Sequence, residues 1–272
     1  MSNEQRVLKA FLMVVSLLIA HCSLLIAEPG FLAQQAQLAW QERDKPGQTE
    51  QAIQIWEQAV HAEPGNTELW MDLTKALGRA VRHAKTSQER QRLADRARAT
   101  AEKAIHLEPS NSQAYALYGE ALGQWADAHK GVHSLKAVRQ AVEALTHAVE
   151  LDPKNAYAHM LLSSFYREAP GVISVGDKKK ALAEAKLAVE TGPDYAIHHL
   201  VLARAYLDHG DKDNAIQQLK TILTLPAPAD AIPETRADQE TAQKMLNELG
   251  VAPAAAPACG ESGGVCTDQP HS

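Results

Sequence analysis

Aromatic residues are scarce in this chain of 272 residues, at 5% of the total, whereas apolar residues as a whole reach 45%. Alanine supplies much of that apolar content. Strand-like alternation of apolar and polar residues is nearly absent, and helical periodicity dominates between the two ends. This composition disfavours a β-sheet protein and favours close-packed helices.

An excess of basic charge is also missing. The chain has 27 Lys and Arg residues against 33 Asp and Glu residues, which gives a formal net charge of -6. A protein that grips a phosphate backbone needs a basic face. We therefore expect no nucleic-acid partner, and solubility is the simplest role for the negative charge.

Signatures of catalysis are lacking too. There is no Gly-x-Ser-x-Gly elbow and no glycine-rich loop followed by Lys-Ser or Lys-Thr. His129 and His133 stand four residues apart, but Gly131 separates them and no glutamate follows the first, unlike the zinc-protease signature. His159 and His199 occupy equivalent repeat positions and are predicted to be packing residues. We predict a protein that is not an enzyme, with no catalytic residue, cofactor or metal site.

The first 27 residues have the pattern of a targeting segment. Arg6 and Lys9 precede an apolar run over residues 11–27, in the order typical of a secretory signal. Three outcomes stay open: cleavage after Ala27, lipid attachment at Cys22, or an uncleaved membrane anchor. The lipid alternative departs from its pattern at His21. Each outcome predicts an exported protein of the periplasm or cell envelope that touches the membrane only through this segment.

The other two cysteines lie in a tail, residues 251–272, which follows the predicted body of residues 28–250. This tail is rich in Ala, Pro, Gly and Ser. Cys259 and Cys266 could form a disulfide in an oxidising compartment, which would stabilise the chain only if their loop is ordered. The alternative is a flexible tail.

A phrase that ends in proline recurs four times along the body, at Pro64, Pro109, Pro153 and Pro193. Each proline is predicted to stop a helix, because it has no amide hydrogen to donate. Alanine recurs five and twelve residues before each proline, and such spacing lets two helices approach closely, while the residue eight before fills the core. The recurring residues are Ala59, Ala104, Ala148 and Ala188 (five before), Trp56, Ala101, Leu145 and Ala185 (eight before), and Ala52, Ala97, Ala141 and Ala181 (twelve before).

Two stretches carry a family resemblance. "YALYGEAL", from Tyr115 to Leu122, and "AIQIWEQAVHAEP", from Ala52 to Pro64, resemble the two halves of the tetratricopeptide repeat. The resemblance covers residues 31–228. It implies an all-α fold, a right-handed α-α superhelix of about five helix pairs, with a concave surface formed by the first helix of each pair. Residues 234–250 are predicted to form a C-terminal capping helix, opened by Pro233.

Departures from the repeat pattern are also informative. The four prolines are 45, 44 and 40 residues apart, whereas the family repeat is about 34 residues long. We expect the additional residues in lengthened joints between the two helices of a pair. One joint, "FYREAPGVISVGDKKKAL", is similar to the T-component proteins associated with TRAP transporters. Gly-Asp-Lys occurs at 176–178 and 210–212; its glycine is predicted to end one helix and its aspartate to cap the next.

The repeat register predicts which side chains line the concave groove. They form a mixed polar and apolar set that suits a peptide or an amphipathic small ligand. The Lys and Asn set by which some family members hold a C-terminal carboxylate is missing. We expect an interaction scaffold for a protein or peptide partner, whereas the T-component resemblance implies a binder of a small organic ligand. The predicted groove residues are Met71, Lys75, Gln113, Glu120, Tyr157, Met160, Ser164, Ile197, Leu200 and Arg204.

Overall fold

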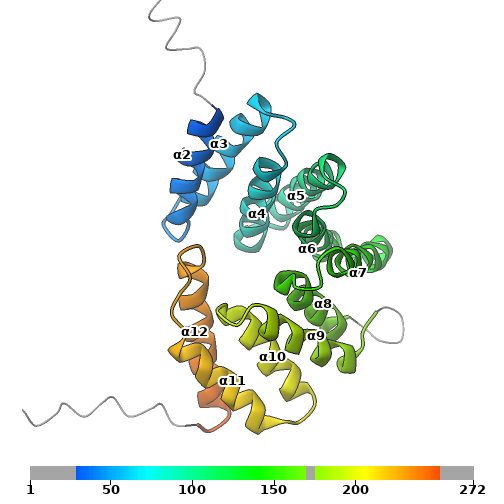
Figure 1. Ribbon diagram of the computed structural model, residues 1–272, viewed down its shortest axis with the longest axis vertical. Helices are drawn as coiled ribbons and strands as arrows, with labels where there is room; N and C mark the ends of the chain where they lie inside the picture. Colours follow the sequence, from blue (N-terminus) through cyan, green and yellow to red (C-terminus); the bar gives the residue numbers. More distant parts are fainter. Residues whose placement is uncertain (1–28, 170–174, 252–272) are drawn as a thin grey trace, which may run out of the picture.

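The computed structural model describes residues 29–169 and 175–251. Within these ranges the chain forms eleven α-helices and no β-strand, so the predicted all-α fold is confirmed (Figure 1). No helix in this part of the chain is long and apolar enough to span a bilayer. The predicted targeting segment with Cys22, and the pair Cys259 and Cys266, lie outside the described residues. The helices are α2 (Pro29–Gln41), α3 (Gln48–Ala62), α4 (Thr67–His83), α5 (Ser87–Leu107), α6 (Ser112–His129), α7 (Val132–Leu151), α8 (Ala156–Glu168), α9 (Lys178–Thr191), α10 (Ala196–Asp208), α11 (Lys212–Thr224) and α12 (Ile232–Glu248).

The prolines end helices as predicted. α3, α5, α7 and α9 each end two residues before one of the four. The next helix then begins with an asparagine cap in three of the four cases: Asn66, Asn111 and Asn155 each accept a hydrogen bond from an amide in the first turn. A Pro-x-Asn turn therefore both stops one helix and starts the next.

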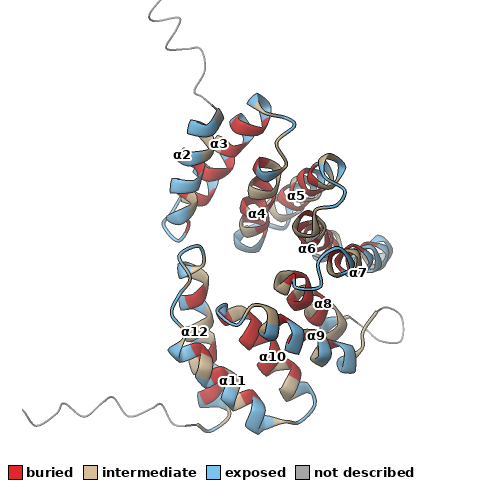
Figure 2. Cartoon of the chain, in the orientation of Figure 1, coloured by how far each residue is buried: buried red, intermediate tan, exposed pale blue. Residues whose placement is uncertain are grey.

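The recurring alanines pack the helices against one another. The eight alanines found five and twelve residues before the prolines are all buried, with at most 1% of their surface exposed. Between them, Trp56 and Leu145 fill the space that the small neighbours leave, and both are fully buried. Figure 2 shows the buried residues along the faces where neighbouring helices meet. The predicted register is therefore confirmed.

Five helix pairs, α2–α3 to α10–α11, follow one another around an arc, and α12 covers the last pair (Figure 1). The first helices α4, α6, α8 and α10 lie on the inner side of this arc, and their partners lie outside (Figure 1). Ala242 and Leu246 of α12 are buried in a core cluster with α10 and α11. The predicted cap is confirmed.

The structure corrects the expectation that the additional residues lie in lengthened joints between the helices of each pair. The additional residues of the second and third pairs lengthen their helices, α4 to α7, to 17, 21, 18 and 20 residues. Residues 87–93 form the first two turns of α5, because Thr86 caps its start and strong helix formers follow. Only the joint between α8 and α9 is long, and Gly176 lies within it, eight residues after α8 ends at Glu168. Gly176 therefore does not end a helix, whereas Asp177 and Asp211 cap α9 and α11 as predicted.

Candidate binding groove

The inner helices present eight of the ten predicted groove residues at their surface. The other two, Met160 and Leu200, are 7% and 2% exposed and lie in core clusters, so a ligand in the groove does not reach them. The apolar side of each inner helix faces its neighbours, and the groove itself is more polar than the register predicts. The eight residues with partly exposed surface are Met71, Lys75, Gln113, Glu120, Tyr157, Ser164, Ile197 and Arg204.

Glu120 is the centre of a polar network that spans three inner helices. Its carboxylate accepts hydrogen bonds from Arg82 Nη1 of α4 at 2.6 Å, Gln124 Nε2 of α6 at 3.0 Å and Tyr157 Oη of α8 at 2.6 Å. Burial and the nearby Glu120 charge raise the pKa of Tyr157 well above its ordinary value, so this phenol stays a donor. The network holds three successive repeats in one orientation and leaves Arg82 half exposed.

Further along the groove, Arg204 of α10 and Asp238 of α12 are half-buried charges without a hydrogen bond to each other. Burial lowers the pKa of Arg204, and the charge of Arg167 lowers it further. Burial raises the pKa of Asp238 to about 6, although Arg204 acts in the opposite direction. Two partly desolvated charges of opposite sign therefore lie at this end of the inner face.

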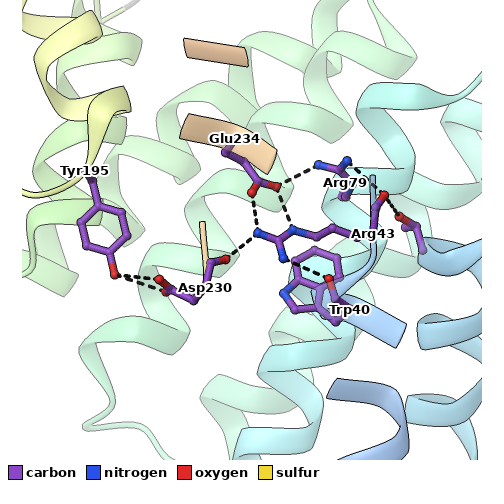
Figure 3. A network of polar contacts seen from close by, with 7 residues as sticks. Trp40, Arg43, Arg79, Tyr195, Asp230 and Glu234 are labelled. Carbon is purple, nitrogen blue, oxygen red and sulfur yellow. Dashed lines mark hydrogen bonds and ion pairs between the residues drawn. The ribbon is translucent and has the colours of Figure 1, made fainter. Parts of the chain in front are cut away.

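Two arginines and one glutamate join the two ends of the arc; we call Arg43, Arg79 and Glu234 the end clasp (Figure 3). Arg43 Nε donates to Glu234 Oε1 at 2.9 Å and its Nη2 donates to Glu234 Oε2, in a forked geometry. Arg79 Nη1 reaches the same carboxylate at 2.8 Å. Burial alone would raise the pKa of Glu234, but the Arg43 hydrogen bond and both positive charges lower it on balance. The carboxylate is thus held ionised between two cations.

Backbone groups complete the clasp. Arg43 Nη1 donates to the Trp40 carbonyl at 3.0 Å, its Nη2 donates to the Asp230 carbonyl, and its guanidinium lies 4.6 Å from the centre of the Trp40 ring (Figure 3). The Tyr195 hydroxyl donates to the Asp230 carboxylate at 3.2 Å. The turn after α2 is thereby tied to the loop before α12.

The histidines predicted to pack do so, and they share one repeated contact. The residue six positions after a repeat proline reaches back to that proline's carbonyl: Trp70 Nε1 at 3.0 Å from Pro64 O, His159 Nε2 at 3.0 Å from Pro153 O, and His199 Nε2 at 2.9 Å from Pro193 O. Both histidines are buried. His129, by contrast, stacks on Trp125. Among the described residues, no three His, Cys, Asp or Glu side chains lie together as a metal ion requires.

Sequence reasoning missed the end clasp and part of the groove. Arg79 and Arg82 continue the α4 face that carries Met71 and Lys75, so extending the register by one or two turns finds them. Arg43 lies in a turn outside any repeat position, and no local pattern indicates its partner.

The stacked helix pairs and their inner face define a tetratricopeptide-repeat solenoid, and residues 166–231 match a tetratricopeptide repeat family. Residues 32–172, just over half of the chain, match the family described as Regulator of microtubule dynamics protein 1-3. The chain belongs to this family. No curated protein matches.

Solved structures of repeat proteins resemble the fold. TTC0263, a tetratricopeptide repeat protein from Thermus thermophilus, is 18% identical with a TM-score of 0.60, covering 80% of this chain and 100% of that one. MamA is 18% identical with a TM-score of 0.43 over 79% and 96% of the chains. YrrB, described as having an unusual peptide-binding site, is 15% identical with a TM-score of 0.41 over 81% and 92%. At these identities the likeness concerns the fold alone.

Proposed function

We propose that the chain is a non-enzymatic interaction scaffold of the cell envelope whose inner groove binds a peptide segment of a partner protein. The observation that supports this proposal is the Glu120 network. It presents Arg82, Gln124 and Tyr157 from three consecutive repeats, while the apolar side chains of the same helices are buried. Such a polar, preorganised surface matches the hydrogen-bonding groups of an extended peptide.

Peptide selection against the full chain tests the groove. Peptides selected from a random display library should bind the Glu120→Ala variant about tenfold or more weakly than the natural chain, because the variant lacks the acceptor that holds three donors in place. Glu143→Ala is the matched control, since Glu143 is exposed on α7, outside the groove. If the selected peptides bind both variants as they bind the natural chain, the groove is not the binding surface.

The proposal that the chain is exported rests on the pattern of its N-terminal segment, and it is tested separately from the groove. N-terminal sequencing of the chain recovered from its own envelope should find Glu28 as the first residue. Recovery of Met1 as the first residue would exclude cleavage and favour the uncleaved membrane anchor. Palmitate labelling that requires Cys22 would instead establish the lipid-linked form.

The end clasp favours a second candidate function, a binder of a small organic ligand. Joining the first turn to the last helix closes the arc, as enclosing a solute requires. A panel of organic acids and lipids should then contain one compound that raises the melting temperature in proportion to its concentration. If no compound in the panel raises the melting temperature, the small-ligand function is wrong and the scaffold function remains.

The family description links the proteins it names to microtubule dynamics. Export and cytoskeletal binding are incompatible proposals, because an exported chain does not meet microtubules. Cosedimentation with polymerised tubulin decides between them, and we expect the chain to stay in the supernatant.

A further inference from the structure

Two hollows flank the C-terminal half of α6, and the second borders the Glu120 network through Arg82 and Gln124. The first lies between α6, α7 and α8 and has a volume of about 350 Å³; the second lies between α4, α5 and α6 and has about 340 Å³. They share Gly123 and Asp127. Gly123 lets the Phe165 ring of the first hollow pack directly against α6, because a Cβ at this position would lie 2.5 Å from Phe165 Cζ. We call the two together the α6 double pocket.

The first hollow has mainly apolar walls, which include Leu135, Val138 and Phe165. Ser134 also lines it, and the Ser134 Oγ is buried without a hydrogen-bond partner. A hydroxyl in this state costs free energy unless a ligand satisfies it. The first hollow therefore suits a bulky apolar group that brings one hydrogen-bonding atom with it.

The second hollow contains two further buried polar atoms without a partner, the acceptor Gln124 Oε1 and the donor Arg90 Nε. A peptide backbone offers an amide donor and a carbonyl acceptor at every residue. Two adjoining hollows with unpaired atoms of both kinds thus match a chain that passes over α6 better than a single small molecule.

The rim carries charges of both signs, since Arg82 and Arg90 line the second hollow, but its most exposed charges are two carboxylates. Asp127 and Glu168 are 71% and 66% exposed, and their partners Arg90 and Arg167 lie at 3.6 and 2.7 Å in exposed ion pairs, which are weak and exchange easily. α6 and α8 also end at this edge, where helix C-termini favour cations. The first turn of α7 adds a partial positive charge, which is smaller than one carboxylate charge.

We propose that the α6 double pocket binds a partner peptide through a bulky apolar residue followed by a lysine or arginine. This inference rests on the proposed peptide-binding function and extends the binding surface beyond the inner groove, which it adjoins at Ser164, Arg82 and Gln124. The apolar residue occupies the first hollow, the basic residue pairs with Asp127 or Glu168, and the backbone contacts Gln124 and Arg90.

Capped tetrapeptides test the proposal directly by ligand-observed NMR titration of the full chain in mild detergent. Ac-Ser-Phe-Lys-Ser-NH2 should bind, the counterpart with Glu in place of Lys should bind about fivefold more weakly, and the one with Ser in place of Phe should not bind. 2-Phenylethylamine is the competitor: if it binds as well as the Phe-Lys peptide, the site takes a small amine and the peptide proposal is wrong.

Two variants locate the binding. Ser134→Ala should weaken the Phe-Lys peptide about fivefold while the melting temperature stays unchanged or rises, since an unsatisfied buried hydroxyl is removed. Val138→Trp should fill the first hollow and abolish binding, and Glu143→Gln, exposed on the same helix, is the control. Unchanged binding to both variants would overturn the proposal.

The outcomes separate this inference from the proposed function. Display-selected peptides that depend on Glu120, together with tetrapeptides that do not bind, would refute the α6 double pocket alone. Tetrapeptides that depend on Ser134, with selected peptides indifferent to Glu120, would support the pocket and refute the groove.

Discussion

Arg43 and Glu234, 191 residues apart in the chain, are joined by a forked pair of hydrogen bonds, Nε to Oε1 at 2.9 Å and Nη2 to Oε2. The Arg43 side chain is only 3% exposed, whereas that of Glu234 is 37% exposed. The pair joins the turn after the first helix to the last helix of a solenoid. In such a fold each repeat otherwise contacts its neighbours alone, so this pair, together with the Arg79–Glu234 pair and the Arg43 bond to the Asp230 carbonyl, couples the two ends.

Breaking the clasp should open the arc. Arg43→Gln is expected to lower the free energy of unfolding by about 2 kcal/mol, because a charged hydrogen-bonded partner of Glu234 is lost at a partly solvated site. It should also raise the radius of gyration in small-angle X-ray scattering. Lys45→Gln is the control, since the Lys45–Glu42 pair lies in the same turn but is exposed. A scattering curve identical to that of the natural chain would show that other contacts hold the ends together.

His159 should make stability depend on pH. Its Nδ1 faces Glu184 Oε2 at 2.6 Å and its Nε2 faces the Pro153 carbonyl, so only the doubly protonated ring satisfies both acceptors. Burial lowers the pKa of His159, but these two hydrogen bonds outweigh it and raise the pKa above 6.5. The stabilisation is therefore complete below pH 6.5 and is lost as the pH rises through the folded-state pKa.

We expect His159→Gln to cost about 1–2 kcal/mol more at pH 5.5 than at pH 8.5 in urea unfolding. Glu184→Gln should remove most of the same pH dependence, because it neutralises the partner. A loss from His159→Gln that is equal at both pH values would mean that the ring is neutral in the folded state.

The fold could be predicted from the sequence because its determinants are local and repeated. A proline that stops a helix and an alanine that allows close approach act within one repeat, so four copies reveal the register. The lengths of α4 to α7 were misjudged for the same reason. The repeat shows where residues are added but not whether they continue a helix, which depends on caps such as Thr86.

The groove was predicted less well. Met160 and Leu200 were assigned by stepping along one helix face, but the curvature of the stack buries the apolar part of that face between neighbours. Arg43 and Glu234 meet only because the arc closes, and closure is the sum of small rotations between many repeats. No periodic pattern in the sequence therefore predicts that the two ends of the arc meet.

Asp238 should make the chain more stable when its charge is removed. Burial raises its pKa from 3.8 to about 6, so the folded state disfavours the carboxylate. The sign follows for this group alone: the contribution of Asp238 to stability is most favourable below pH 3.8 and is lost as the pH rises through about 6. Asp238→Asn should therefore raise the midpoint of urea unfolding, with a gain that grows from pH 4.5 to pH 7 and then levels off. Glu240→Gln, exposed on the same helix, should change little, and an equal gain from it would contradict this origin.

Asn155 should matter more than the equivalent cap Asn111. Both accept a hydrogen bond from an amide in the first turn of the helix they begin. The Asn111 Nδ2 donates only to Glu108 in an exposed local bond, whereas Asn155 is 8% exposed and its Nδ2 donates to Ser112 Oγ of another helix at 2.7 Å. Ser112 Oγ in turn donates to the Ala148 carbonyl at 2.8 Å, so Asn155 connects the starts of α8 and α6 with the end of α7.

Loss of an ordinary cap costs about 1 kcal/mol, and loss of a buried side-chain hydrogen bond adds about as much again. Asn111→Ala should therefore lower the free energy of unfolding by about 1 kcal/mol and Asn155→Ala by about 2 kcal/mol. Urea unfolding of the two variants side by side measures the difference. Equal losses would mean that the bond between Asn155 and Ser112 adds nothing to the cap.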